Sequence, residues 1–125
     1  MPRRSGRRPL MDVDNASTAA GADVLLRDCH TAANQLWTTW AGGETRVFGD
    51  KCLDAYNQGT TNGTRVITWP CNGQNNQKWT LGPDGTIRNA HAGLCLDTDR
   101  SGTTNATPLV LWTCDGQTSQ KWTRA

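Results

Sequence analysis

The chain has little of what most protein cores are built from: its 125 residues include one Tyr, one Phe and two Met. No apolar run is long enough to cross a membrane, so we expect no membrane partner. Neither of the two His, His30 and His91, has a Ser or Cys nucleophile at the spacing of a known catalytic motif. We therefore expect that the chain is not an enzyme and binds no cofactor. Gly, Thr and Asn are abundant and six Trp are present, a composition that suits short strands joined by many turns.

Positive charge is concentrated in the first ten residues, which contain Arg3, Arg4, Arg7 and Arg8. The other nine basic side chains stand against eleven acidic ones, so the rest of the chain carries −2 although the whole chain carries +2. This balance gives no basic surface for nucleic acid, and the partner should be neutral. Residues 1–9 lack the apolar stretch of a signal peptide and are predicted to be a disordered tail or a degenerate first strand. Nucleic-acid binding by this tail is a weaker alternative, because no aromatic residue accompanies it.

One pattern of about 40 residues occurs three times along the chain. Each occurrence starts with a Leu-Asp-like step, passes through a short alternating strand and ends in Gln-x-Trp, at Trp37, Trp79 and Trp122. We call these stretches copy one (10–42), copy two (43–84) and copy three (85–125). Copies two and three share identical spacing without a gap, whereas copy one is degenerate. Because turn clusters separate the short strands, we predict an all-β domain in which three similar units close around an axis.

Cysteine spacing repeats with the pattern, since Cys52 and Cys71, and likewise Cys95 and Cys114, are nineteen positions apart. No Cys-x-x-Cys occurs and no His stands at ligand spacing, so we expect no metal site and predict two disulfides instead. Disulfides imply an oxidising, extracellular location. Cys29 is left single because Leu10 stands at its partner position; it is predicted to be a buried thiol, with intermolecular pairing as the alternative.

Three Gln-x-Trp elements in register, each preceded by a Cys-Leu-Asp-like start, resemble the ricin-B-type lectins and carbohydrate-binding module family 13. The resemblance covers residues 10–125 and implies a β-trefoil. The segments 49–54 and 93–97 look most like modules of actinobacterial enzymes that degrade xylan or arabinan. The resemblance therefore implies a glycoside hydrolase as parent or partner of this chain.

In the family that the chain resembles, each copy can form a sugar site from an Asp, an aromatic plate and a polar pair that ends at the Gln of Gln-x-Trp. Copy two has all four, namely Asp54, Trp69, Asn76 and Gln77. Copy three has Asp97, Trp112 and Gln120 but Ser119 in the Asn position, so we expect an auxiliary site. Copy one has Asp12, Asn34 and Gln35, but Arg27 replaces the plate and is expected to pair with Asp12 or Asp28, which impairs the site.

Two of these residues also have a purely structural interpretation. Asp54 is the type of residue that stabilises a turn through nearby backbone N–H groups, and Trp69 could be a packing residue. All copies also lack a Gln that many family members have four positions before the second Cys, where this chain has Leu25, Ile67 and Val110.

We therefore expect a monomer that binds neutral polysaccharide or oligosaccharide, such as xylan-, arabinan- or galactose-containing chains, and that carries out no chemistry. The alternative is a trefoil that binds proteins, for example an inhibitor or a docking module. The degenerate copy one and the missing Gln positions favour that alternative, whereas two Trp paired with Asp in register argue against it.

Overall fold

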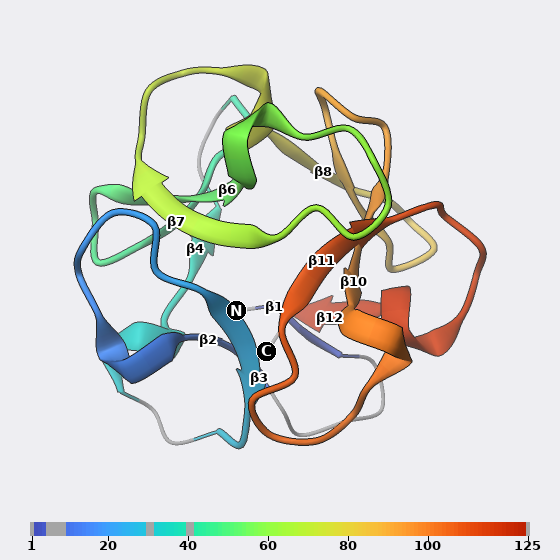
Figure 1. The fold of residues 1–125 in the computed structure, drawn as a ribbon, viewed down its shortest axis with the longest axis horizontal. Coiled ribbons are helices and arrows are strands. Elements are labelled where there is room, and N and C mark those ends of the chain that lie inside the picture. Colours follow the sequence, from blue (N-terminus) through green and yellow to red (C-terminus); the bar gives the residue numbers. More distant parts are fainter. Residues whose placement is uncertain (1, 5–9, 30–31, 40–41, 125) are drawn as a thin grey trace.

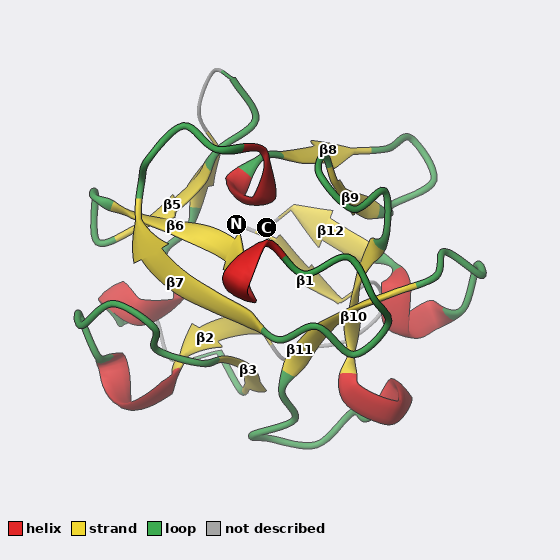
Figure 2. Cartoon of the chain, turned by 45° about the horizontal axis from the view of Figure 1, so that its top comes forward, coloured by secondary structure: helices red, strands yellow, loops and turns green. Residues whose placement is uncertain are grey.

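The structure is a computed structural model that describes residues 2–4, 10–29, 32–39 and 42–124. In these residues the chain forms three four-stranded antiparallel sheets (Figures 1 and 2). In spatial order, the first sheet contains β12 (Trp122–Arg124), β1 (Pro2–Arg4), β2 (Leu10–Val13) and β3 (Val24–Arg27). The second contains β4 (Thr38–Thr39), β5 (Thr45–Val47), β6 (Lys51–Ala55) and β7 (Val66–Pro70). The third contains β11 (Leu109–Trp112), β10 (Cys95–Thr98), β9 (Ile87–Asn89) and β8 (Trp79–Leu81). The predicted all-β fold is confirmed.

In the described residues, six single turns of 3₁₀ helix complete the threefold pattern, two in each copy. One follows the strand that carries the Asp, and the other includes the Gln of Gln-x-Trp. They are η1 (Asp14–Ala16), η2 (Ala33–Gln35), η3 (Tyr56–Gln58), η4 (Asn75–Gln77), η5 (Asp99–Ser101) and η6 (Thr118–Gln120). No helix in the described part of the chain is long and apolar enough to cross a membrane.

The first sheet joins the two ends of the chain. Strand β1 lies between β12 and β2, with Arg3 opposite Thr123 on one side and opposite Leu10 on the other. In Figure 1 the blue and the red ends of the chain therefore meet near the centre of the molecule. Of the two alternatives for residues 1–9, the strand applies to residues 2–4, while residues 1 and 5–9 lie outside the described part.

The three Trp of the Gln-x-Trp elements lie in the core, as their symmetric positions predict. Each indole donates a hydrogen bond to the backbone carbonyl of the residue before the repeated Asp: Trp37 to Met11 at 2.9 Å, Trp79 to Leu53 at 2.9 Å, and Trp122 to Leu96 at 3.1 Å. A Trp buries up to about 250 Å², so three of them supply much of the apolar area that Phe and Tyr provide elsewhere. Aliphatic side chains surround them, including Met11, Val13, Leu26, Leu53, Leu96 and Leu111.

One loop of each copy crosses to the next copy. We call residues 17–23, 59–65 and 102–108 the crossing loops. In each, a residue with a left-handed backbone donates its N–H to a strand of the following copy: Gly21 to Thr68 at 2.7 Å, Gly63 to Leu111 at 2.8 Å, and Ala106 to Leu26 at 2.7 Å. The three copies are therefore linked by main-chain hydrogen bonds in a closed ring.

The two predicted disulfides are confirmed: Cys52 bonds Cys71 and Cys95 bonds Cys114. The predicted burial of Cys29 is wrong, because this free cysteine is exposed. It follows β3 on a surface segment, and the position opposite, which is a cysteine in the other copies, is the fully buried Leu10. In copies two and three the disulfide ties this surface segment to the buried strand. Cys29 has no such bond, so nothing holds its side chain against the core.

Candidate functional site

Copy two has a pocket of about 320 Å³ on the outer side of the β6–β7 pair. Asp54 comes from β6, and Ile67 and Trp69 come from the paired strand β7, where Ile67 lies opposite Asp54. Turn η3 and the segment after Cys71 supply the rim. The remaining lining residues are Tyr56, Asn57, Gln58, Asn72, Gln74 and Asn76.

The Asp54 carboxylate is held by two amides. Its Oδ1 accepts a hydrogen bond from Asn76 Nδ2 at 3.1 Å and its Oδ2 accepts one from Gln77 Nε2 at 2.8 Å. The side chain is 4% exposed, and this burial raises the pKa of the Asp54 carboxyl above its usual range, although both amide hydrogen bonds act in the opposite direction. A carboxylate has about four acceptor positions, so Asp54 keeps capacity for donors that enter the pocket.

Gln77 lies behind the carboxylate and not in the pocket lining. It is fully buried, and its Nε2 also donates to the Pro70 carbonyl at 3.1 Å while its Oε1 accepts from the Asn72 N–H at 2.9 Å. Gln77 therefore fixes Asp54 and the segment that carries Asn72 at once. Asn76 does line the pocket, and its Nδ2 also donates to the Ala55 carbonyl at 3.0 Å.

Trp69 has the position that an aromatic plate needs. It is 43% exposed at the end of β7, whereas Val66 and Thr68 of the same strand are fully buried. Ile67 lies beside it in the pocket, at the position where the resemblance predicts a Gln, so an apolar group lines this part of the site. Asp54 and Trp69, which the sequence analysis assigned to one site, therefore line the same pocket.

Sequence reasoning missed the residues of turn η3. Tyr56 is 58% exposed and lines the pocket, and Asn57 and Gln58 adopt left-handed backbone conformations with φ of 54° and 55°. Left-handed conformations are unfavourable for residues other than Gly and tend to cluster at functional sites. The available signal was positional, because a mostly polar triplet begins two residues after the Asp in each copy.

Copy three has a pocket of about 410 Å³ that includes Asp97 and Trp112, and Trp112 is as exposed as Trp69. Gln120 Nε2 donates to Asp97 Oδ2 at 2.9 Å, as in copy two. Ser119 is too short to replace the amide of Asn76 and bonds Ser101 at 3.4 Å, while Asp97 Oδ1 accepts the Thr98 N–H at 2.7 Å. Asp97 is therefore held by one side-chain amide and by the backbone N–H of the next residue.

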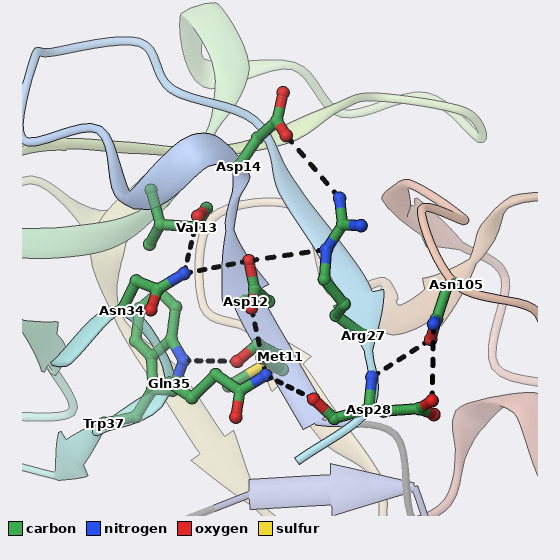
Figure 3. Close-up of polar contacts among 10 residues, drawn as sticks. All are labelled: Met11, Asp12, Val13, Asp14, Arg27, Asp28, Asn34, Gln35, Trp37 and Asn105. Atoms are coloured by element: carbon green, nitrogen blue, oxygen red, sulfur yellow. Dashed lines mark hydrogen bonds and ion pairs between the residues drawn. The ribbon is translucent and has the colours of Figure 1, made fainter. Parts of the chain in front are cut away.

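Copy one retains the two amides that hold the Asp carboxylate but lacks the aromatic plate (Figure 3). Asp12 accepts hydrogen bonds from Asn34 at 3.1 Å and Gln35 at 2.9 Å. The Arg27 guanidinium stands in the plate position, with Nε 4.0 Å from Asp12 Oδ1 and Nη2 3.7 Å from Asp14 Oδ1 (Figure 3).

The expected pairing of Arg27 thus occurs with Asp12, and Asp14 is a partner that the sequence reasoning missed. Asp28 bonds Asn105 of a crossing loop instead: its N–H donates to Asn105 Oδ1 at 3.0 Å, and its Oδ2 accepts from Asn105 Nδ2 at 3.4 Å.

Known proteins with the same fold put this geometry in context. The sequence profile of the ricin-type beta-trefoil lectin domain matches residues 4–122. The crystal structure of a designed threefold symmetric protein, ThreeFoil, is 30% identical, with a TM-score of 0.82 over 91% of this chain and 88% of that one.

Two plant proteins are also similar. A non-toxic homologue of type II RIPs from bitter gourd (Momordica charantia), solved in complex with α-methyl-D-galactoside, is 28% identical with a TM-score of 0.84. The agglutinin from Abrus precatorius is 27% identical with a TM-score of 0.85. Each match covers 98% of this chain but only 46% and 47% of those proteins, so the chain spans about half of their length.

Proposed function

Because this chain belongs to the ricin-type beta-trefoil lectin domain family, we propose that it binds neutral glycans, mainly through the pocket of copy two, and carries out no chemistry. The observation that supports this most is that an exposed Trp69 and a buried Asp54, whose carboxylate is held by two amides, line the same pocket. A sugar ring has a face of C–H groups and an edge of hydroxyls, and this pair offers one partner for each.

In the proposed complex the C–H face of the sugar stacks on the Trp69 indole, and two hydroxyls donate to Asp54. The rim residues Tyr56, Asn72 and Gln74 lie where they can bond further hydroxyls. A shallow pocket of this kind returns about 4 to 6 kcal/mol, which corresponds to dissociation constants from millimolar to tens of micromolar. The galactoside bound to the bitter gourd protein supports a galactose-type sugar as the first ligand to test.

We assign an auxiliary role to copy three and an impaired role to copy one. Asp97 and Trp112 retain the carboxylate and the plate, whereas Arg27 in copy one pairs with the Asp12 carboxylate that a sugar would need. Two weak sites on one domain increase the retention on a polysaccharide when their spacing matches the chain, without any new contact.

The two disulfides support an extracellular location, where polysaccharides are accessible. We further propose that the chain holds a partner enzyme at its glycan. A glycoside hydrolase that acts on xylan, arabinan or galactan is the partner that fits this role, and the chain itself is expected to act as a monomer.

The test is a pull-down of the purified chain on insoluble xylan, arabinan, galactan and mannan, beside Asp54→Ala and Asp12→Ala. The two variants are matched, because each removes a buried carboxylate that is held by one Asn and one Gln. We expect retention on at least one polymer, abolished by Asp54→Ala and kept by Asp12→Ala. If the folded protein binds no polymer, the protein-interaction alternative replaces this proposal and Trp69 becomes a packing residue.

A further inference from the structure

The pockets of copies two and three both contain an Asp and an exposed Trp, but the residues at their rims differ in charge. Tyr56 and Asn72 of copy two correspond to Asp99 and Asp115 of copy three, 43 positions later in each case. All four residues line their pockets and are exposed. Among the described residues that line the pocket of copy two, Asp54 is the only carboxylate.

The pocket of copy three is therefore acidic. Its lining contains the carboxylates of Asp97, Asp99 and Asp115 against a single guanidinium, that of Arg100. Within the described part of the chain, no ion pair involves any of these four side chains. Their charges are thus available to a ligand.

The arrangement does not suit a small metal ion. Among the described residues, the three carboxylates do not bring their oxygens within 4.8 Å of one another, as a shared ion would require. They are instead spread around a pocket of about 410 Å³ that has the exposed face of Trp112 as one wall. Such a site suits an organic cation with an apolar face, because a cation near an indole gains from its π-electrons as well as from the carboxylates.

From these observations we propose that copy three binds an amino sugar with a free, protonated amine, while copy two binds the neutral sugar. This inference rests on the proposed function, since it uses the same plate and the same carboxylate. The ring stacks on Trp112, a hydroxyl donates to Asp97, and the ammonium group lies between Asp99 and Asp115. The chain then recognises glycans that contain both neutral and deacetylated amino-sugar units.

The substitution that tests the charge is well matched. Asp115 Oδ1 accepts the Gln117 N–H at 3.1 Å, and Asn72 Oδ1 accepts the Gln74 N–H at 2.9 Å in the same turn of copy two. Asp115→Asn therefore keeps the turn and removes only the charge. Asn72→Asp makes the reverse change in copy two.

The experiment is a titration followed by the ¹H–¹⁵N signals of the Trp112 and Trp69 indoles, assigned with Trp112→Phe and Trp69→Phe. The probes are methyl galactosaminide, methyl glucosaminide, their N-acetyl forms and the corresponding neutral methyl glycosides, at a pH below the pKa of the sugar amine. At Trp112 we expect an amine to bind about tenfold more tightly than its N-acetyl and neutral counterparts, since two exposed carboxylates each contribute a modest ion pair. Trp69 should show no such preference.

The variants define the remaining outcomes. Asp115→Asn combined with Asp99→Tyr should remove the preference at Trp112, and Asn72→Asp should create one at Trp69. Equal affinity of Trp112 for amine and neutral probes overturns this inference and leaves the proposed function intact as long as Trp69 responds to a sugar. If neither indole responds to any probe in a folded protein, the proposed function fails and this inference with it.

Discussion

Gln77 Nε2 lies 2.8 Å from Asp54 Oδ2, and the same amide-to-carboxylate bond joins Gln35 to Asp12 and Gln120 to Asp97 at 2.9 Å. Two residues after each Gln, the core Trp donates its indole N–H to the carbonyl of the residue just before the Asp. One Gln-x-Trp element thus fixes a core residue and a pocket carboxylate on the same strand. The position of the site is therefore set by the packing of the core.

The first prediction ranks the three carboxylates. Asp54→Ala should lower the retention on the preferred polysaccharide most, Asp97→Ala should lower it less, and Asp12→Ala should have almost no effect, because Arg27 already pairs with Asp12. Affinity electrophoresis in gels that contain the soluble polysaccharide measures the three variants side by side. Equal losses for all three would show that Arg27 does not disable copy one.

The second prediction concerns Gln77, which is buried behind Asp54 and does not line the pocket. Gln77→Ala leaves Asp54 with one amide and removes the bonds to Pro70 and Asn72, so the free energy of unfolding should fall by about 2 to 3 kcal/mol. The affinity of copy two should fall as well, because its carboxylate is less well oriented. Chemical denaturation and sugar titration measure the two effects.

Gln35→Ala is the control for this experiment. It removes the equivalent bonds to Asp12 and to the Asp28 carbonyl, so it should destabilise the fold without changing the affinity of copy two. A Gln77→Ala variant that binds sugar as tightly as the wild type would show that Asp54 needs no second amide.

The third prediction is a gain of function in copy one. Asp12, Asn34 and Gln35 are arranged as in copy two, and Arg27 stands where Trp69 does. Arg27→Trp should remove the ion pairs to Asp12 and Asp14 and supply an aromatic plate. Calorimetric titration should then show one additional weak site for the sugar that copy two binds. Unchanged stoichiometry would mean that more than the plate has been lost from copy one.

The fourth prediction concerns pH. Burial raises the pKa of the Asp54 carboxyl, so between the unfolded and the folded pKa the folded state binds more protons than the unfolded state. The stability that Asp54 contributes is therefore fully present below the unfolded pKa and is lost as the pH rises through the folded one. Sugar hydroxyls donate to the ionised form, so the affinity of copy two should change in the opposite direction and fall on acidification, from a pH above the range of an ordinary Asp.

Asp54→Asn separates this effect from the other carboxyls. The melting temperature of the wild type minus that of Asp54→Asn should fall as the pH rises through the window between the unfolded and the folded pKa of Asp54, and should stay constant outside it. A difference that is constant across the acidic range would contradict the assignment to Asp54.

The sequence predicted what repeats and failed where the backbone is irregular. The repeated short strands and turn clusters predicted the all-β fold, the symmetric Gln-x-Trp elements predicted the core position of the three Trp, and the repeated cysteine spacing predicted both disulfides. That Asp54 and Trp69 belong to one site was implied by the family resemblance, and strand alternation added the outward position of Trp69. The strand and core positions depend on periodic burial, which a sequence displays directly.

Other features could not be predicted from the sequence, because they depend on unusual local conformations. Turn η3 places Tyr56 at the pocket through left-handed Asn57 and Gln58, and no Gly marks that conformation. The ion pair between Arg27 and Asp14 depends on the equivalent turn η1. The orientation of Gln77 behind Asp54 was also hidden, since a sequence gives the presence of an amide but not the side of the carboxylate on which it lies.

The crossing loops have a consequence for how such a domain can change over time. The loop of copy one donates to the strand that carries Trp69, so the copy whose own pocket is blocked by Arg27 still supports the pocket of its neighbour. Mutation can therefore retire a pocket at little cost to the fold, whereas deletion of a whole copy would open the ring. The side chains of each pocket can therefore change independently while the three copies remain necessary for one fold. The acidic rim of copy three and the guanidinium of copy one are two such changes.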